Sequence, residues 1–203
     1  MAIYTMRLTT FYAIFLALVL AVYAKPHKTG FCATSPFPQV NGVQVPDKAT
    51  CSSTALGEIP DVDNMVSTLI LFPTPETTIK ANKPFTAAVK VTNLDTGFFL
   101  DPEHDYYKVP QRLNKKGQIQ GHGHITVQKL KNLHTPPPAS KFDFFAALNG
   151  KTGKNGLFKQ KVDGLSAGIY RLCTLSASAS HAPLVMPVAK RGAQDDCVRF
   201  RVK

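Results

Sequence analysis

The sequence lacks tryptophan, any Asn-x-Ser/Thr triplet and any Cys-x-x-Cys pair. The missing tryptophan argues against a carbohydrate site, because such sites commonly stack sugars on aromatic side chains. The missing triplet predicts no N-glycosylation, and the missing Cys-x-x-Cys spacing argues against a cysteine zinc site. We expect the cysteines to be oxidised, so no thiolate is available as a nucleophile. We therefore expect no catalytic residue and no enzyme activity.

An apolar run is present only at the beginning of the chain, where residues 8–23 follow the positive charge of Arg7. The run is shorter than the roughly 20 residues that a spanning helix needs. It ends in Val22-Tyr23-Ala24, whose residues at the −3 and −1 positions suit signal peptidase. We interpret residues 1–24 as a signal peptide rather than an uncleaved anchor, with Lys25 as the mature N-terminus. The sequence thus predicts a secreted, extracellular protein with no membrane association once the signal is removed.

The formal net charge is +11 at pH 7, which on its own is compatible with nucleic acid, an anionic polysaccharide or an acidic protein partner. The lysines and arginines are scattered, however, and form neither a dense run nor a basic amphipathic helix. This distribution is typical of a solvated basic surface, so we expect no nucleic-acid partner.

The cysteines are even in number and follow the predicted signal peptide, which indicates two disulfides. They are Cys32, Cys51, Cys173 and Cys197. Three connectivities are compatible with the count. We favour the local pairing, 32 with 51 and 173 with 197, because residue 173 lies in an expected strand at 170–175 and residue 197 opens the last expected strand.

Period-2 alternation of apolar and polar residues predicts strands rather than helices over most of the chain. Residues 85–92 show it most clearly, with Phe85, Ala87, Val89 and Val91 on one face. Further strands are expected at 68–72, 124–130, 157–162, 170–175, 184–189 and 197–202, and helical turns within 142–148. Residues 25–66 are rich in proline and glycine, and we interpret them as an irregular arm held by a disulfide. The chain is thus predicted to comprise a signal peptide (1–24), an arm (25–66) and an all-β, antiparallel β-sandwich (67–203) of about seven or eight strands.

Two segments could carry metal or acid–base chemistry. Asp101, Glu103 and Asp105 form an acidic cluster that we interpret as a solvated loop rather than a glycosidase pair. In Gly121-His122-Gly123-His124 the two imidazoles would share one face of a strand, as metal ligands can. His104 or Asp105 could complete such a set, but two ligands rarely make a site alone. We therefore expect no metal and no cofactor, and keep a copper or zinc enzyme using His122 and His124 as an alternative.

The segment 93–99 leaves the clearest strand and contains residues that favour turns. It is either a plain connection whose phenylalanines return to the core, or an ordered binding loop on a rigid sandwich.

This segment resembles the Asn-Pro-Thr-Thr-Gly-Tyr/Phe loop of chagasin-type inhibitors of papain-like cysteine proteases, and Gly121-His122-Gly123 is similar to their second, glycine-rich loop. No equivalent of their third loop is present, and Leu94 and Asp95 depart from the first motif. The resemblance implies an Ig-like sandwich that inserts loops into a protease cleft. The residues it would assign to protease binding are Asn93, Thr96, Gly97, Phe98, Gly121, His122 and Gly123.

A broader resemblance covers roughly residues 50–203 and links the chain to small secreted fungal proteins that include the rust transferred proteins. It is carried by the stretches 85–99, 106–107, 110–114, 121–128, 167–171 and 195–200. For those effectors of rust fungi the resemblance implies delivery into plant tissue, protease inhibition and self-assembly into filaments. Our leading hypothesis is therefore a secreted effector that inhibits a papain-like cysteine protease of the host or the fungus. Self-association through an exposed sheet edge is the second hypothesis.

Overall fold

The computed structural model describes residues 28–75 and 77–203. The predicted signal peptide and the predicted start at Lys25 lie outside the described residues. The described chain forms two compact units. The smaller comprises residues 28–40 and 45–53, and the larger comprises residues 41–44 and 54–203. Residues 54–66, which the sequence analysis placed in the arm, belong to the larger unit.

The smaller unit is irregular apart from one 3-10 helix, η1 (Gly30–Thr34). The Cys32–Cys51 disulfide closes it, with a Cα–Cα distance of 5.8 Å, and the buried Cys32 amide also donates to the Ser53 hydroxyl at 3.0 Å. Backbone hydrogen bonds join residues 38–40 to Cys51. The disulfide and these few bonds hold a segment that has little apolar side chain to bury.

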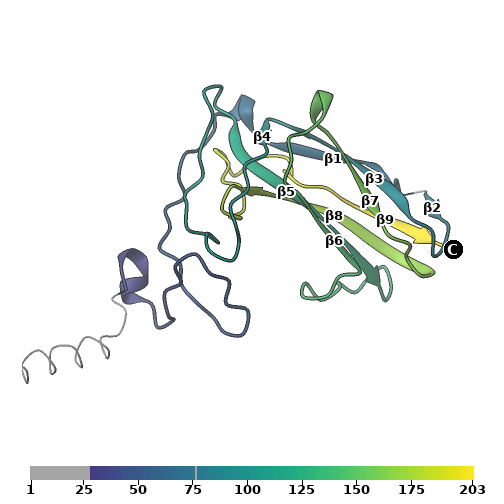
Figure 1. Cartoon of the computed structure of the whole chain (residues 1–203), viewed down its shortest axis with the longest axis horizontal. Coiled ribbons are helices and arrows are strands. Elements are labelled where there is room, and N and C mark those ends of the chain that lie inside the picture. The colour runs from purple at the N-terminus through teal and green to yellow at the C-terminus, as the bar shows by residue number, and fades with distance from the viewer. Residues whose placement is uncertain (1–27, 76) are drawn as a thin grey trace, which may run out of the picture. The chain divides into compact units, whose positions relative to one another are not determined.

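The larger unit contains nine strands and two short 3-10 helices among the described residues. Figure 1 shows the strands stacked as a sandwich of two twisted sheets. The elements are η2 (Val62–Asn64), β1 (Ser67–Phe72), β2 (Thr78–Ile79), β3 (Phe85–Thr92), β4 (Leu94–Thr96), β5 (Ile119–Leu130), β6 (Phe144–Leu148), η3 (Lys154–Gly156), β7 (Leu157–Val162), β8 (Gly168–Ser178) and β9 (Cys197–Val202).

The first sheet has the order β1-β3-β7 and is antiparallel. The second has the order β2-β9-β8-β5-β4, and β6 also pairs with β5. Two pairs in the second sheet, β2 with β9 and β4 with β5, are parallel, so that sheet is mixed rather than purely antiparallel. The central pair, β5 with β8, keeps an unbroken antiparallel register from Gly121 opposite Ser178 to Leu130 opposite Ile169.

The core lies between the two sheets, where the apolar faces of the alternating strands meet. Ala87 and Val89 of β3 pack with Ile125 and Val127 of β5, and all four are buried. The Tyr170 ring stacks on Phe200 at a centroid distance of 5.9 Å. Burying one such side chain is worth about 1.5–3 kcal/mol, so this layer supplies most of the driving force for folding. The predicted all-β sandwich is confirmed.

The strands expected at 68–72, 85–92, 157–162, 170–175 and 197–202 are present, and the one at 124–130 is part of the longer β5. Both predicted disulfides are confirmed, and Cys173 pairs directly with Cys197 across β8 and β9. The helical turns expected at 142–148 are wrong, because residues 144–148 pair with β5 as a strand. The strand expected at 184–189 is also wrong. Pro183 and Pro187 lack the N–H that a continued ladder would need.

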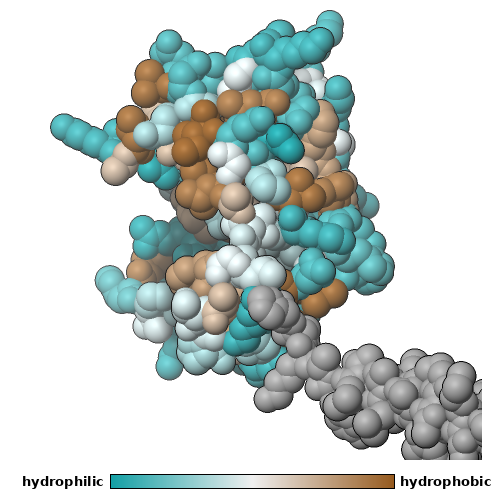
Figure 2. Space-filling model, turned by 90° about the vertical axis from the view of Figure 1, so that its left-hand side faces the viewer, coloured by the Kyte–Doolittle hydropathy of each residue, from teal (hydrophilic) through white to brown (hydrophobic). Residues whose placement is uncertain are grey.

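In the described part of the chain, no helix has the length and apolar character needed to cross a membrane. The surface mixes hydrophobic and hydrophilic side chains, as Figure 2 shows for one face. Several large apolar side chains are exposed, among them Leu69 on β1 and Phe145 on β6.

Candidate metal centre

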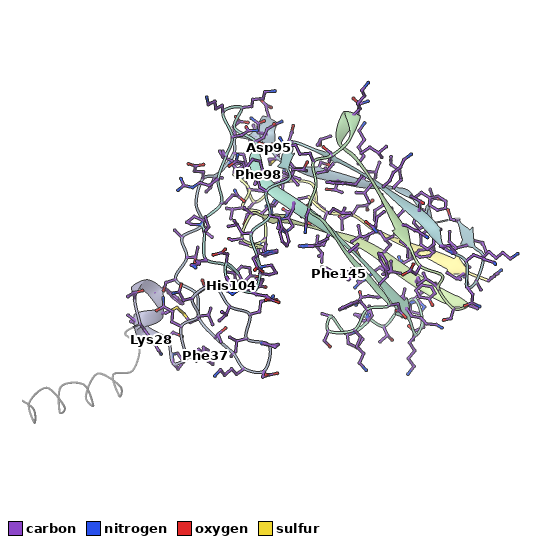
Figure 3. The ribbon with its side chains drawn as sticks, in the orientation of Figure 1. Lys28, Phe37, Asp95, Phe98, His104 and Phe145 are labelled. Atoms are coloured by element: carbon purple, nitrogen blue, oxygen red, sulfur yellow. A yellow bond between two sulfur atoms is a disulfide. The ribbon has the colours of Figure 1, made fainter. Side chains whose placement is uncertain are left out.

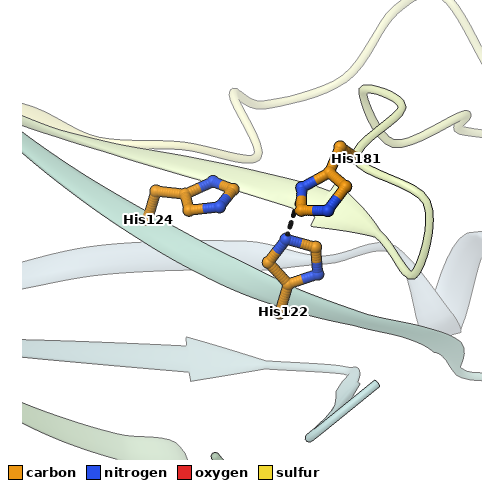
Figure 4. A group of neighbouring side chains, drawn as sticks. All are labelled: His122, His124 and His181. Carbon is orange, nitrogen blue, oxygen red and sulfur yellow. Dashed lines mark hydrogen bonds between the residues drawn. The ribbon is translucent and has the colours of Figure 1, made fainter. Parts of the chain in front are cut away.

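Three histidines converge where β5 lies beside the turn that follows β8. His122 and His124 are two residues apart on β5 and therefore point to the same side of the sheet. His181 comes from the tight turn that follows β8, in which its amide donates to the Ser178 carbonyl at 3.0 Å. Because Ala177 is the register partner of His122, this turn brings residue 181 next to residue 122. Figure 4 shows the three rings gathered over these strands.

The imidazole nitrogens of the three side chains lie within 4.8 Å of one another. His122 Nε2 and His181 Nδ1 are only 3.2 Å apart, the contact dashed in Figure 4. The ring centroids of His122 and His124 are 4.7 Å apart, and their planes are nearly perpendicular, at 86°. His122 is fully buried, whereas His124 and His181 are partly buried, so the cluster has one inner and two outer members.

Backbone carbonyls fix which nitrogen of two of these rings carries hydrogen. His122 Nδ1 lies 3.0 Å from the Phe98 carbonyl oxygen, and His181 Nε2 lies 2.7 Å from that of Leu100. A carbonyl oxygen only accepts, so each of these nitrogens must donate. In a neutral imidazole the other nitrogen then has a lone pair. When both rings are neutral, the lone pairs are on His122 Nε2 and His181 Nδ1, and these two atoms face each other at 3.2 Å.

The carbonyls of Phe98 and Leu100 are themselves held in place. The Phe98 amide donates to the Gly121 carbonyl at 3.2 Å, and the Leu100 amide donates to the Ala179 carbonyl at 2.9 Å. The segment after β4 thus extends the parallel pairing of β4 with β5 and then bonds to the His181 turn. Phe99, between the two carbonyls, packs its ring edge-on against His122 and His181, at 5.0 Å from each.

Burial favours the neutral form of His122 and His124. It lowers the pKa of His122 to about 4, and the neighbouring His124 and His181 lower it further in the same direction. Burial also lowers the pKa of His124 to about 4, with His181 acting in the same sense and the Leu175 carbonyl opposing it. Neutral imidazole is the form that binds metals, so at pH 7 no proton has to be removed from these two rings first.

The residues that the sequence assigned to a first protease-binding loop lie in a strand and its continuation. Asn93 has φ of 59°, and its side-chain amide donates to the Asp63 and Met65 carbonyls at 2.9 and 3.1 Å. Thr96 ends β4, and its side chain is buried beside Thr152. Gly97 has φ of 93° and Phe98, labelled in Figure 3, follows it with its amide bonded to β5. Residues 94–96 thus form a strand that pairs with β5, and the Phe98 amide continues this pairing. Protease binding by residues 93–98 stays a prediction.

The glycine-rich turn expected at 121–123 is corrected, since Gly121, His122 and Gly123 lie inside β5. Gly121 is required by close packing. A Cβ at this position would lie 2.1 Å from the Ala177 carbonyl oxygen, whereas one at Gly123 would meet nothing closer than 3.8 Å.

His104 and Asp105, which the sequence suggested as further ligands beside His122 and His124, do not complete the set. His104 bonds to the exposed Asp101 carboxylate at 3.0 Å and groups with Asp101 and Glu103. Figure 3 shows His104 on the segment that carries this exposed acidic cluster. The third member is His181 instead. It is 59 residues from His122, and no local motif marks it, so only the β5–β8 register could have identified it.

Comparison with known proteins places the chain in a family. The family model described as the CLU5d N-terminal domain matches residues 68–203. A curated protein of Colletotrichum graminicola, "Pathogenicity cluster 5 protein d", is 43% identical over 157 residues. That alignment covers 75% of this chain but 33% of the relative, so the chain spans about a third of the relative's length.

Solved structures resemble the chain only distantly. The soluble domain of PmoD from Methylocystis sp. ATCC 49242 (Rockwell) aligns with a TM-score of 0.34 at 10% identity, covering 68% of this chain and 89% of that one. A superoxide reductase (neelaredoxin) from Ignicoccus hospitalis aligns with a TM-score of 0.33 at 11% identity, covering 73% and 96%. Similarity at this level carries no functional implication.

Proposed function

We propose that this member of the CLU5d N-terminal domain family is a secreted, effector-like fungal protein. We further propose that it binds a transition metal through His122, His124 and His181. The name of the Colletotrichum graminicola relative supports the effector-like part of the proposal, and the two disulfides are compatible with an extracellular protein. The proposal is for metal binding and includes no catalytic step.

The observation that carries the metal proposal is the pair of lone pairs facing each other at 3.2 Å, on His122 Nε2 and His181 Nδ1. Two acceptors in contact repel each other unless a cation lies between or beside them. Zinc or copper binds imidazole nitrogen at about 2.0–2.1 Å, and a tetrahedral angle at the metal then separates two nitrogens by roughly 3.3 Å. The observed spacing therefore fits a shared metal, with His124 as the third ligand.

The backbone carbonyls that bond to the second nitrogen of two rings fit the same interpretation. Histidines that bind metals usually donate their second N–H to a carboxylate or a backbone carbonyl, which fixes the tautomer and the ring orientation. His122 and His181 both do so, to Phe98 and Leu100.

An all-imidazole donor set favours copper or zinc over magnesium, calcium or manganese, which prefer oxygen ligands. No thiolate competes in the described chain, because all four cysteines form disulfides. In the usual order of affinities Cu²⁺ binds more tightly than Zn²⁺ at a given nitrogen site, so we expect Cu²⁺ to bind most tightly here.

The test is metal binding by the chain purified without its first 24 residues, with His27 replaced by alanine so that this histidine contributes nothing. Titration calorimetry with Cu²⁺ and with Zn²⁺ measures affinity and stoichiometry, and electron paramagnetic resonance of the copper form reports the nitrogen ligands. We expect one ion per chain. His122→Ala, His124→Ala and His181→Ala should each weaken binding by at least tenfold.

His104→Ala and His134→Ala serve as matched controls, because both histidines are exposed and neither belongs to the cluster. They should leave the affinity unchanged. If wild type binds neither ion, or if the controls lose as much affinity as the cluster variants, the three-histidine site is wrong.

Inhibition of papain-like cysteine proteases and self-assembly stay predictions from the sequence. Residues 94–96 pair with β5 and Gly121 lies inside β5, so these two segments are strands rather than loops at those positions. An assay against a panel of papain-like proteases at micromolar concentration tests the inhibitor hypothesis directly.

A further inference from the structure

A hollow of about 570 Å³ opens on the outer side of the second sheet, next to the histidine cluster. Pockets that bind small molecules commonly measure about 300–1,000 Å³, so one or a few aromatic rings would fit. His124 and His181 line the hollow, whereas the fully buried His122 does not. A metal held by the three rings would therefore be reached from the hollow, on the side of its two outer ligands.

The walls of the hollow near the cluster are aromatic and aliphatic. Phe145 stacks on His124 at a centroid distance of 5.2 Å, and Tyr106 stacks on Tyr107 at 4.0 Å. Leu175, the register partner of His124, is 47% exposed, and Phe145 is 46% exposed. Large apolar side chains rarely line an open hollow beside polar ligands unless something apolar packs on them. A flat ring is the shape that aromatic walls accommodate best.

The lining of the hollow also includes polar and acidic side chains. Gln194 and Asp195 line it, and Asp195 Oδ1 accepts from the Ser176 amide and hydroxyl at 2.8 and 2.9 Å and from the Thr174 hydroxyl at 3.0 Å. This fixed carboxylate repels an anionic aromatic acid. It does not repel a phenol, which enters uncharged and gives its proton to solvent water when its oxygen binds the metal.

From these features we infer that the hollow binds a phenolic ring whose oxygen coordinates the metal and whose ring packs on Phe145 and Leu175. The inference rests on the proposed metal site. The ring could belong to a free phenol or to a tyrosine side chain of another protein, since both present the same chemistry.

The test uses the copper-loaded protein and two probes, 4-methylphenol for a free phenol and the peptide Gly-Tyr-Gly for a tyrosine side chain. Binding of a phenolate to Cu²⁺ produces a charge-transfer band in visible light, and its growth with probe concentration gives the affinity. 4-Methylcyclohexanol, which has the hydroxyl but no aromatic ring, should give no band. We expect at least one phenolic probe to bind, and the more effective one identifies the source.

Ala147→Trp fills the hollow from an exposed position opposite His124 on the edge strand β6. It should weaken phenol binding at least tenfold while copper affinity stays within about twofold. Ala139→Trp is the matched control, because Ala139 is also exposed but does not line the hollow. If Ala147→Trp loses copper, Leu175→Ala is tested in its place. Removal of the Leu175 side chain should weaken binding of the phenolic probe severalfold.

A wild-type protein that holds copper but gives no band with either probe overturns this inference and leaves the metal site intact. A band that is unchanged in Ala147→Trp, or in Leu175→Ala where that variant is used, also overturns it. Failure of wild type to bind copper overturns this inference, and failure to bind zinc as well overturns the proposed function.

Discussion

Acidification should destabilise the metal-free protein between pH 6.5 and pH 4, because His122 is buried in its neutral form. Its pKa is lowered from 6.5 to about 4, so in this window the unfolded chain binds a proton that the folded chain does not. The free energy of unfolding therefore falls as the pH falls through the window, and the full contribution is present above pH 6.5.

The size of the effect follows from the shift. At pH 5 the His122 ring of the unfolded chain is mostly protonated, whereas that of the folded chain is mostly neutral, which costs about 2 kcal/mol of stability relative to pH 7. His124, whose pKa is also lowered to about 4, acts in the same direction. Part of each shift reflects repulsion within the cluster, so the two contributions do not simply add, and we expect about 2–4 kcal/mol for the pair.

Urea unfolding at pH 7, 6 and 5 after dialysis against a chelator measures the effect. Far-ultraviolet circular dichroism and tyrosine fluorescence are suitable probes, because the chain without its first 24 residues keeps Tyr106, Tyr107 and Tyr170 and has no tryptophan. His122→Gln removes the titrating ring and should flatten the pH dependence, whatever it does to absolute stability. His134→Gln, a change at an exposed position, should keep the wild-type dependence. Equal slopes for wild type and His122→Gln would refute the argument.

Three further predictions concern residues that support the fold around the site. Gly121→Ala should lower the free energy of unfolding by about 2 kcal/mol or more in urea unfolding, because its Cβ would lie 2.1 Å from a backbone oxygen. Gly123→Ala should lower it by less than about 1 kcal/mol, because its Cβ would meet nothing closer than 3.8 Å. Replacing both Cys173 and Cys197 by alanine should lower stability by about 3 kcal/mol, the chain-entropy value for a loop of this length, and an unchanged urea midpoint would contradict it. Gly97→Arg should destabilise the fold by about 1–2 kcal/mol because of its positive φ. If wild type inhibits papain-like proteases and Gly97→Arg inhibits them equally well, the loop assignment fails.

The sandwich could be predicted from the sequence because its core strands alternate strictly. The pattern of β3 is a property of single residues in order, so Ala87, Val89 and Val91 could be assigned to the core before any partner was known. β2 and β4 have two and three residues, too few for a period to show. Residues 144–148 form a strand because they pair with β5. This pairing depends on the tertiary structure, so the local sequence does not predict it.

Two of the three histidines of the candidate site could be predicted for the same reason. His122 and His124 share a face by strand geometry alone, whereas His181 joins them only through the register of β5 with β8 and the turn after Ser178. The glycines beside His122 suggested a turn. Gly121 in fact allows the close approach of a neighbouring backbone, and sequence alone does not distinguish these two uses of glycine.

Counting hydrogens explains why the cluster is more than a structural hydrogen-bond network. His181 and His122 together make three contacts that each need one hydrogen. These are the contact of His181 with the Leu100 carbonyl, the contact between the two rings, and the contact of His122 with the Phe98 carbonyl. Two neutral imidazoles supply two hydrogens, so one contact stays without one. Turning either ring to its other tautomer would fill the gap only by removing the hydrogen from a carbonyl contact.

The missing positive charge can come from a third proton or from a metal ion. A third proton on His122 would make an imidazolium of a fully buried ring, which the lowered pKa of His122, about 4, disfavours at neutral pH. A metal ion fills the gap without protonating either ring, and His124 adds a third nitrogen to it. Protons and metal therefore compete for the same place, and lowering the pH toward 4 should release the metal while the carbonyl contacts still hold the rings in position.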